Sequence, residues 1–196
     1  MNFMNKISSL LIAAYFISSC SNMPFEAIAP AVRSAFIGAE KLNITEDFYD
    51  AQEYSFANVR IGRNISAILV LEAVIDDIYV WTSSKGEKIH TFNGKIVKTI
   101  GLERDIELFN GFLFNFERGH NFQYEVMVSN PSAFLEINSE MSFDLSKKLY
   151  VEKMSSKVLS WKYQNIYKIN TDGQVVFSKQ EFHPSEPAIE MEFYYK

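Results

Sequence analysis

The segment Lys88–Ile100, KIHTFNGKIVKTI, decides the fold prediction because two short β-type runs flank the dipeptide Asn93-Gly94. Both residues of that dipeptide tolerate a positive φ, which a two-residue hairpin turn requires. We therefore predict a strand over Lys88–Phe92, a tight turn, and a return strand over Lys95–Ile100.

Strand patterns of the same kind continue on both sides of this hairpin. The run Ser66–Ile75 is almost wholly apolar, which predicts a strand buried on both faces. The remaining predicted strands are Ile78–Ser83, Phe122–Val128, Phe134–Ile137, Ser142–Leu145, Lys148–Lys153, Trp161–Ile169, Gln174–Phe182 and Ala188–Tyr195. About ten strands with short links predict an all-β, mainly antiparallel domain, either barrel-like or a sandwich.

Composition narrows the function classes before any motif is considered. The chain has 196 residues, 47% of them hydrophobic, which suits one folded domain rather than a disordered tract. Its formal net charge is -5. Nucleic-acid binding is not expected, because neutralising phosphates requires a basic face.

The first twenty residues resemble an export signal. Lys6 precedes the apolar run Ile7–Ile17, which is too short for a transmembrane helix of about twenty residues. The run ends in Ile17-Ser18-Ser19-Cys20, which resembles a bacterial lipobox, where the cysteine becomes the lipidated first residue. An ordinary signal peptide with an incidental cysteine is the alternative. Ser21, in place of an aspartate, favours the outer membrane as the destination.

We therefore predict a lipoprotein signal peptide over residues 1–19 and a lipidated tether over residues 20–43. Apolar residues every four positions indicate a short helix over Pro30–Ala39 within the tether. Residues 44–196 are predicted to form the β-rich domain, which would face the periplasm.

Catalytic and metal-binding signatures are missing from the sequence. It contains no G-x-S-x-G, no H-E-x-x-H and no glycine-rich phosphate loop. His90, His120 and His183 lie far apart, and we interpret them as structural or surface residues. Asp76 and Asp77 are interpreted as turn residues rather than paired catalytic carboxylates. We predict no metal and no cofactor.

Aromatic side chains are the remaining candidates for ligand contact. Trp81, Trp161 and Tyr167 are the candidate glycan or partner contacts, because aromatic faces pack against sugar rings. Packing in the core is the more common use of strand aromatics, and we favour it for each tryptophan.

Two ordered signatures resemble a known family. The first comprises Tyr54, the apolar run Ile68–Leu71, Trp81 and His90-x-x-Asn93-Gly94-Lys95-x-Val97-Lys98-Thr99-x-Gly101-Leu102. The second comprises Trp161, Asn165-x-Tyr167, Asp172-Gly173-Gln174-Val175, Ser178, Gln180, Pro184, Pro187 and Ile189–Phe193. Together they resemble the YjbF/GfcB family, outer-membrane lipoproteins of group 4 capsule and related exopolysaccharide systems. Lys95 stands where the family often has arginine, and Leu108–Lys157 matches poorly.

The resemblance implies a non-catalytic accessory component of polysaccharide secretion or assembly, with no catalytic residues to carry over. The expected partners are the membrane, through the lipid, and other export proteins, namely a periplasmic companion and an outer-membrane barrel. Direct binding of polysaccharide would be weak. A periplasmic glycan-active hydrolase or lyase, and a general envelope-assembly lipoprotein, are the alternatives.

Overall fold

A computed structural model describes residues 43–63, 66–109, 116, 119–158 and 160–196, which all belong to one compact unit of the chain. The predicted signal peptide, Cys20 and the helix predicted over Pro30–Ala39 lie outside these residues. Within the described part, no helix has the length and apolar character needed to cross a membrane.

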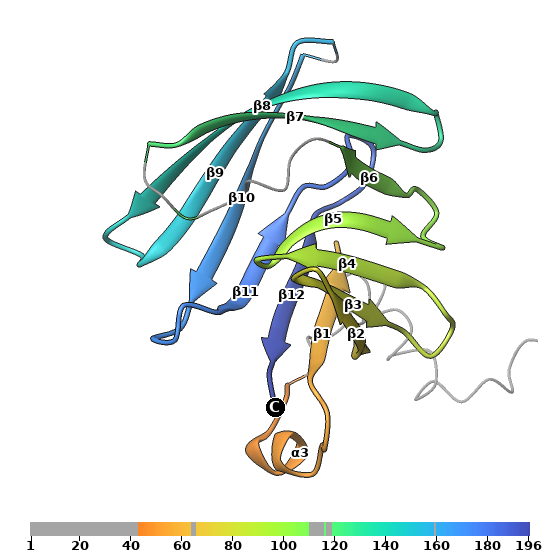
Figure 1. Cartoon of the computed structure of the whole chain (residues 1–196), viewed down its shortest axis with the longest axis vertical. Coiled ribbons are helices and arrows are strands. Elements are labelled where there is room, and N and C mark those ends of the chain that lie inside the picture. The colour runs from red at the N-terminus through yellow and green to blue at the C-terminus, as the bar shows by residue number, and fades with distance from the viewer. Residues whose placement is uncertain (1–42, 64–65, 110–115, 117–118, 159) are drawn as a thin grey trace, which may run out of the picture. The chain divides into compact units, whose positions relative to one another are not determined.

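The described residues form a closed, fully antiparallel β-barrel in which each strand pairs with its neighbours in sequence (Figure 1). The first and last strands, β1 and β12, close the barrel through six residue pairs from Phe56↔Tyr194 to Ile61↔Ile189. The strands are β1 (Phe56–Ile61), β2 (Ala67–Ile75), β3 (Ile78–Thr82), β4 (Lys88–Phe92), β5 (Lys95–Ile100), β6 (Ile106–Phe109), β7 (Asn121–Val128), β8 (Ala133–Asp144), β9 (Leu149–Ser156), β10 (Trp161–Ile169), β11 (Val175–Gln180) and β12 (Ile189–Tyr194). The all-β, barrel-like prediction is confirmed, and the barrel rather than the sandwich is found.

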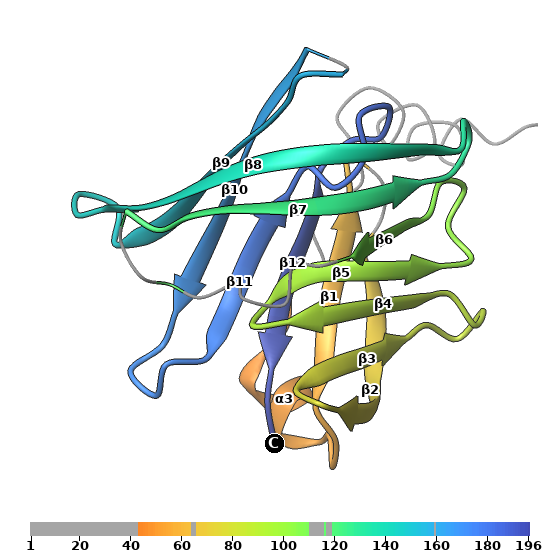
Figure 2. The same ribbon diagram turned by 45° about the horizontal axis from the view of Figure 1, so that its top comes forward.

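Strands β7 and β8 cross β11 and β12 at a steep angle, as Figure 2 shows from a second side. A five-residue helix, α3 (Glu46–Asp50), precedes β1. Thr45 caps this helix by accepting a hydrogen bond from the backbone N–H of Phe48 at 3.2 Å. The Tyr49 hydroxyl donates to the backbone carbonyl of Tyr195 at 2.8 Å, which ties the helix to the end of the chain beyond β12.

The turns follow the predicted chemistry. Asn93 and Gly94 have φ values of 47° and 73°, as a two-residue turn between β4 and β5 requires. Asp76 and Asp77, at 50° and 64°, form the same kind of turn between β2 and β3. The interpretation of the two aspartates as turn residues is confirmed.

Three strand predictions are corrected. The described residues contain twelve strands rather than about ten, since β1 and the four-residue β6 were not predicted separately. The candidates Phe134–Ile137 and Ser142–Leu145 are parts of the single strand β8. The strand continues through the residues between the two candidates, where Asn138 and Glu140 are outward positions of an alternating strand whose inward residues are buried.

Strand β2 is not buried on both faces, as its apolar run had predicted. Only Leu69 is buried, while Val74 and Ile75 are 51% and 60% exposed. A barrel strand has one interior face, and no other described element covers the outward face of β2. Apolar character alone therefore overestimated its burial.

Gly94 lies so close to strand β11 that there is no room for a side chain at this position. A Cβ built on Gly94 would lie 2.6 Å from the Cβ of Val175 on β11, and φ there is positive. We predict that Gly94→Ala lowers the free energy of unfolding by about 2–4 kcal/mol, through backbone strain plus this clash. Urea denaturation measures the change.

Gly86 is the matched control, because its φ is also positive but nothing lies within 4 Å of its Cβ position. Gly86→Ala should cost only the strain, about 1–2 kcal/mol. Val175→Gly removes the Cβ and both methyl groups that the new side chain would meet, so Gly94→Ala should cost less in a Val175→Gly background than in the wild-type protein. Equal costs for the two glycine variants would contradict the proposed contact.

Candidate functional site

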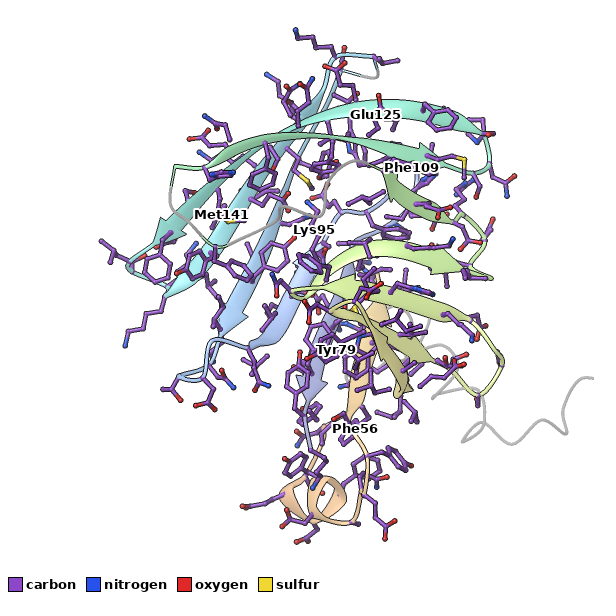
Figure 3. The ribbon with its side chains drawn as sticks, viewed as in Figure 1. Phe56, Tyr79, Lys95, Phe109, Glu125 and Met141 are labelled. Atoms are coloured by element: carbon purple, nitrogen blue, oxygen red, sulfur yellow. The ribbon has the colours of Figure 1, made fainter. Side chains whose placement is uncertain are left out.

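A group of polar side chains lies inside the barrel, where apolar residues would be expected. We call it the interior polar cluster. It contains one cation and one anion, and its members come from β5, β7, β8, β9, β10 and β11. Figure 3 labels the cation, Lys95, near the middle of the barrel. Its residues are Lys95, Tyr124, Ser139, Glu152, Asn165, Tyr167, Ser178 and Gln180, which are all buried.

Glu152 is the centre of this cluster. Its carboxylate pairs with the Lys95 ammonium, and the two side chains are 0% and 4% exposed. Ser139 Oγ donates to Oε1 at 2.8 Å. Tyr167 Oη and Asn165 Nδ2 donate to Oε2 at 2.8 and 3.1 Å. Both carboxylate oxygens are thus satisfied, which a buried charge requires.

The same burial shifts the proton affinities of the neighbouring groups. Desolvation lowers the pKa of Lys95, and the Glu152 carboxylate offsets part of that effect. Desolvation, with a further contribution from the negative charge of Glu152, raises the pKa of Tyr124 and of Tyr167 well above the usual value of 10.0. Both tyrosines therefore stay protonated and serve as hydrogen-bonding groups.

Gln180 joins the β4–β5 hairpin to the opposite side of the barrel. Its Oε1 accepts from the backbone N–H of Ile96 at 2.9 Å, and its Nε2 donates to the carbonyl of Gly94 at 2.8 Å. The Tyr167 hydroxyl lies 3.4 Å from the same Gln180 oxygen. Residues of the two sequence signatures therefore meet in space, although Gln180 is 84 positions from Ile96 and 86 from Gly94 in the chain.

The three candidate contact aromatics have different positions. Trp81 is 0% exposed and donates from Nε1 to Thr91 Oγ1 at 2.9 Å, so its interpretation as a core residue is confirmed. Tyr167 is also 0% exposed, within the interior polar cluster. Trp161 is half-buried and stacks on Tyr163 at 3.8 Å between ring centroids. In this structure only Trp161 offers surface to a ligand, and its role as a contact stays a prediction.

The histidines are not brought together. His183 is buried, accepts from the backbone N–H of Ser185 and lies 3.1 Å from the carbonyl of Ser129, as a structural histidine does. Among the described residues, no group of three or more histidine, cysteine, aspartate or glutamate side chains has the arrangement of a metal site.

A second feature is a hollow of about 900 Å³ at strands β7–β10, which we call the outer trough. Its side walls consist of polar and charged residues in two rows. One row is Asn121, Glu140, Lys153, Gln164 and Glu181, and the other is Gln123, Asn138, Ser155 and Lys162. Between the rows lie Phe122, Ser139, Met154 and Tyr163. The sequence alone did not predict this site, although the alternation of polar with apolar residues in these strands is its signal.

Comparison with known proteins supports the resemblance over part of the chain. A family model described as "Group 4 capsule polysaccharide lipoprotein gfcB, YjbF" matches residues 30–111, which include the β4–β5 hairpin. No curated protein matches the chain.

A solved structure supports the fold. The chain is similar to the crystal structure of the hypothetical lipoprotein YmcC from Escherichia coli K12, with a TM-score of 0.70 and 18% sequence identity. The similarity covers 90% of this chain and 98% of the YmcC chain. The predicted resemblance to the YjbF family, whose model describes a capsule polysaccharide lipoprotein, is confirmed over residues 30–111.

Because the ion pair is buried, we predict that removing one of its charges lowers the free energy of unfolding far more than removing both. Lys95→Met leaves the Glu152 charge buried without its cation, so we expect a loss of about 3–5 kcal/mol in the free energy of unfolding. Lys95→Met combined with Glu152→Gln removes both charges and should recover most of that loss. Urea denaturation measures all three proteins.

Lys98 provides a control on the same strand, because its ion pair with Glu107 is partly exposed at both ends. Lys98→Met should cost less than about 1 kcal/mol. If Lys95→Met lowers the free energy of unfolding no more than Lys98→Met does, the buried pair contributes no more to stability than the partly exposed pair, which would contradict the prediction.

The buried tyrosines predict a loss of stability in alkali. Their pKa values are raised in the folded state, so above pH 10 the unfolded chain releases protons that the folded chain retains. The stabilisation is complete below pH 10 and declines as pH rises, by up to about 1.4 kcal/mol per pH unit for each tyrosine. Tyr167→Phe should reduce this slope, as measured by urea denaturation from pH 8 to 11.

Proposed function

We propose that this chain is a non-catalytic accessory component of the secretion or assembly of a capsular polysaccharide. The family match over residues 30–111 is the observation that carries the proposal. We also propose that a lipid on Cys20 holds the domain at the outer membrane, facing the periplasm. The lipobox-like sequence Ile17-Ser18-Ser19-Cys20 supports this part.

The placement of carboxylates supports a role without catalysis. Glu152 is enclosed, and its oxygens are occupied by Lys95 and by hydrogen-bond donors, so it is not available as a nucleophile or a general acid. In the outer trough, Glu140 and Glu181 occupy the same row three chain segments apart. Neighbouring strands lie about 4.8 Å apart, so these positions are separated by about 14 Å. Glycosidase carboxylates are typically about 5–10 Å apart.

The proposed partners follow from the tethering. A lipid anchor keeps the domain close to other proteins of the export system, which raises their effective concentration and permits weak individual contacts. A periplasmic companion and an outer-membrane barrel protein are the partners that this proposal names.

A deletion and complementation experiment tests the function and the anchor together. Deleting the gene should lower the amount of polysaccharide at the cell surface, and the wild-type gene should restore it. Cys20→Ala should take no label from radioactive palmitate and should fail to restore surface polysaccharide, although the protein is still produced. Ser21→Ala, at the neighbouring position, should be labelled and should restore it.

Two results would contradict the proposal. Unchanged surface polysaccharide in the deletion strain would remove the capsule role, and full complementation by an unlabelled Cys20→Ala protein would remove the anchor. Incubating purified protein with the polysaccharide distinguishes the enzyme alternative, because a hydrolase or lyase would shorten the polymer.

A further inference from the structure

The outer trough lies on the outward face of the β7–β10 sheet. In an antiparallel sheet, side chains alternate between the two faces. Ser139, Met154 and Tyr163 are buried and share the inward face with Glu152 and Asn165, so they contribute mainly backbone to the floor of the trough. The residues on either side of them in each strand have opposite orientation, and nearly all are exposed.

Strand pairing arranges these outward residues in two parallel rows. The register sets Asn121 opposite Glu140 and Glu140 opposite Lys153, which forms one row across the strands. It sets Asn138 opposite Ser155, which belongs to the other row. The rows are two residues apart, or about 7 Å, and five neighbouring chain segments span about 19 Å. These dimensions suit an extended chain lying across the strands.

The side chains of the two rows offer hydrogen bonds without net charge. Four of the nine are amides, which donate and accept at once, and one is a serine: Asn121, Gln123, Asn138, Gln164 and Ser155. The remaining four are two lysines and two glutamates, whose charges cancel: Lys153, Lys162, Glu140 and Glu181. A ligand with many hydroxyl groups and little charge matches this pattern, because each hydroxyl both donates and accepts.

The composition fits other macromolecules poorly. Nucleic acid requires an excess of basic residues, and the walls have none. The centres of protein interfaces are enriched in aromatic residues, methionine and arginine and depleted in lysine, glutamate and serine. The rows contain lysine, glutamate and serine, and their side chains include no aromatic residue or arginine.

We propose that the outer trough binds an extended, largely uncharged stretch of polysaccharide, through amide and hydroxyl hydrogen bonds across β7–β10. This proposal rests on the proposed function, which supplies the polymer as the ligand class. The trough is open along its length, so a polymer lies in it without being enclosed. Binding is therefore weak and insensitive to salt.

Filling the trough tests the proposal. The full chain is extracted in detergent micelles and titrated by calorimetry with polysaccharide. The polysaccharide is purified from the bacterial strain that carries the gene for this protein. Ser155→Trp places a large ring between the two rows and should weaken binding by about tenfold or more. Ser84→Trp makes the same chemical change at an exposed turn residue between β3 and β4 and should leave the affinity unchanged.

A second variant removes hydrogen bonds instead of adding bulk. Asn138→Ala combined with Gln164→Ala takes one amide from each row and should also weaken binding by about tenfold. Thermal unfolding of each variant verifies that it is folded. The affinity of the wild-type protein should change by less than about twofold between 50 and 500 mM NaCl.

The outcomes separate this proposal from the proposed function. If the polysaccharide does not bind, or binds Ser155→Trp and the wild-type protein equally, the trough is not its site, although the deletion phenotype can still hold. A steep salt dependence would mean that charge, rather than neutral hydrogen bonding, drives the binding. If the trough variants lose binding while the deletion strain keeps its surface polysaccharide, the site is real and the proposed function fails.

Discussion

The buried pair of Lys95 and Glu152 is the interaction on which the arrangement of the barrel depends. A carboxylate with no exposed surface must receive a cation and hydrogen bonds from its surroundings, because leaving a buried charge unpaired costs about 3–5 kcal/mol, a large part of the stability of a typical domain. Lys95, Ser139, Asn165 and Tyr167 supply them from three different strands, β5, β8 and β10. Shifting any of these strands by one residue would turn its polar group to solvent and leave Glu152 unpaired.

The β4–β5 hairpin is held against the opposite wall by the same region. Gln180 bonds to both Gly94 and Ile96, and the missing side chain of Gly94 lets the turn approach Val175. Because the polar groups inside the barrel are committed to one another, they stabilise a single arrangement rather than remaining available for a reaction. This division fits a protein that presents a rigid outer surface to a polymer or to partner proteins.

Much of the fold could be predicted, since local patterns determine it. Strands β4, β5 and β10 begin and end at the predicted residues, because turn residues with positive φ bound the first two and β-favouring residues fill the third. The errors have physical causes. Strand β8 was predicted as two shorter strands, although its polar residues are outward positions of one continuous strand, and the apolar run of β2 predicted burial on both faces, although the strand has one interior face.

The sequence singled out some members of the interior polar cluster but did not predict that they lie together. Lys95, Asn165, Tyr167 and Gln180 belong to the two signatures, but nothing in their spacing says that they meet. Glu152 comes from a segment that resembles the family poorly, and a glutamate in a strand is usually solvent-exposed. The outer trough was not predicted at all, because it requires the register of four strands.

The sequence alone determined the β class, the antiparallel hairpins, the family resemblance and the lipobox-like motif, because each depends on residues close together in the chain. Tertiary structure decided that the sheet closes through β1 and β12, that Glu152 and Lys95 meet, and that nine polar side chains flank one trough. These features depend on register and closure, which bring together residues from distant strands, and chain order does not specify which faces will meet.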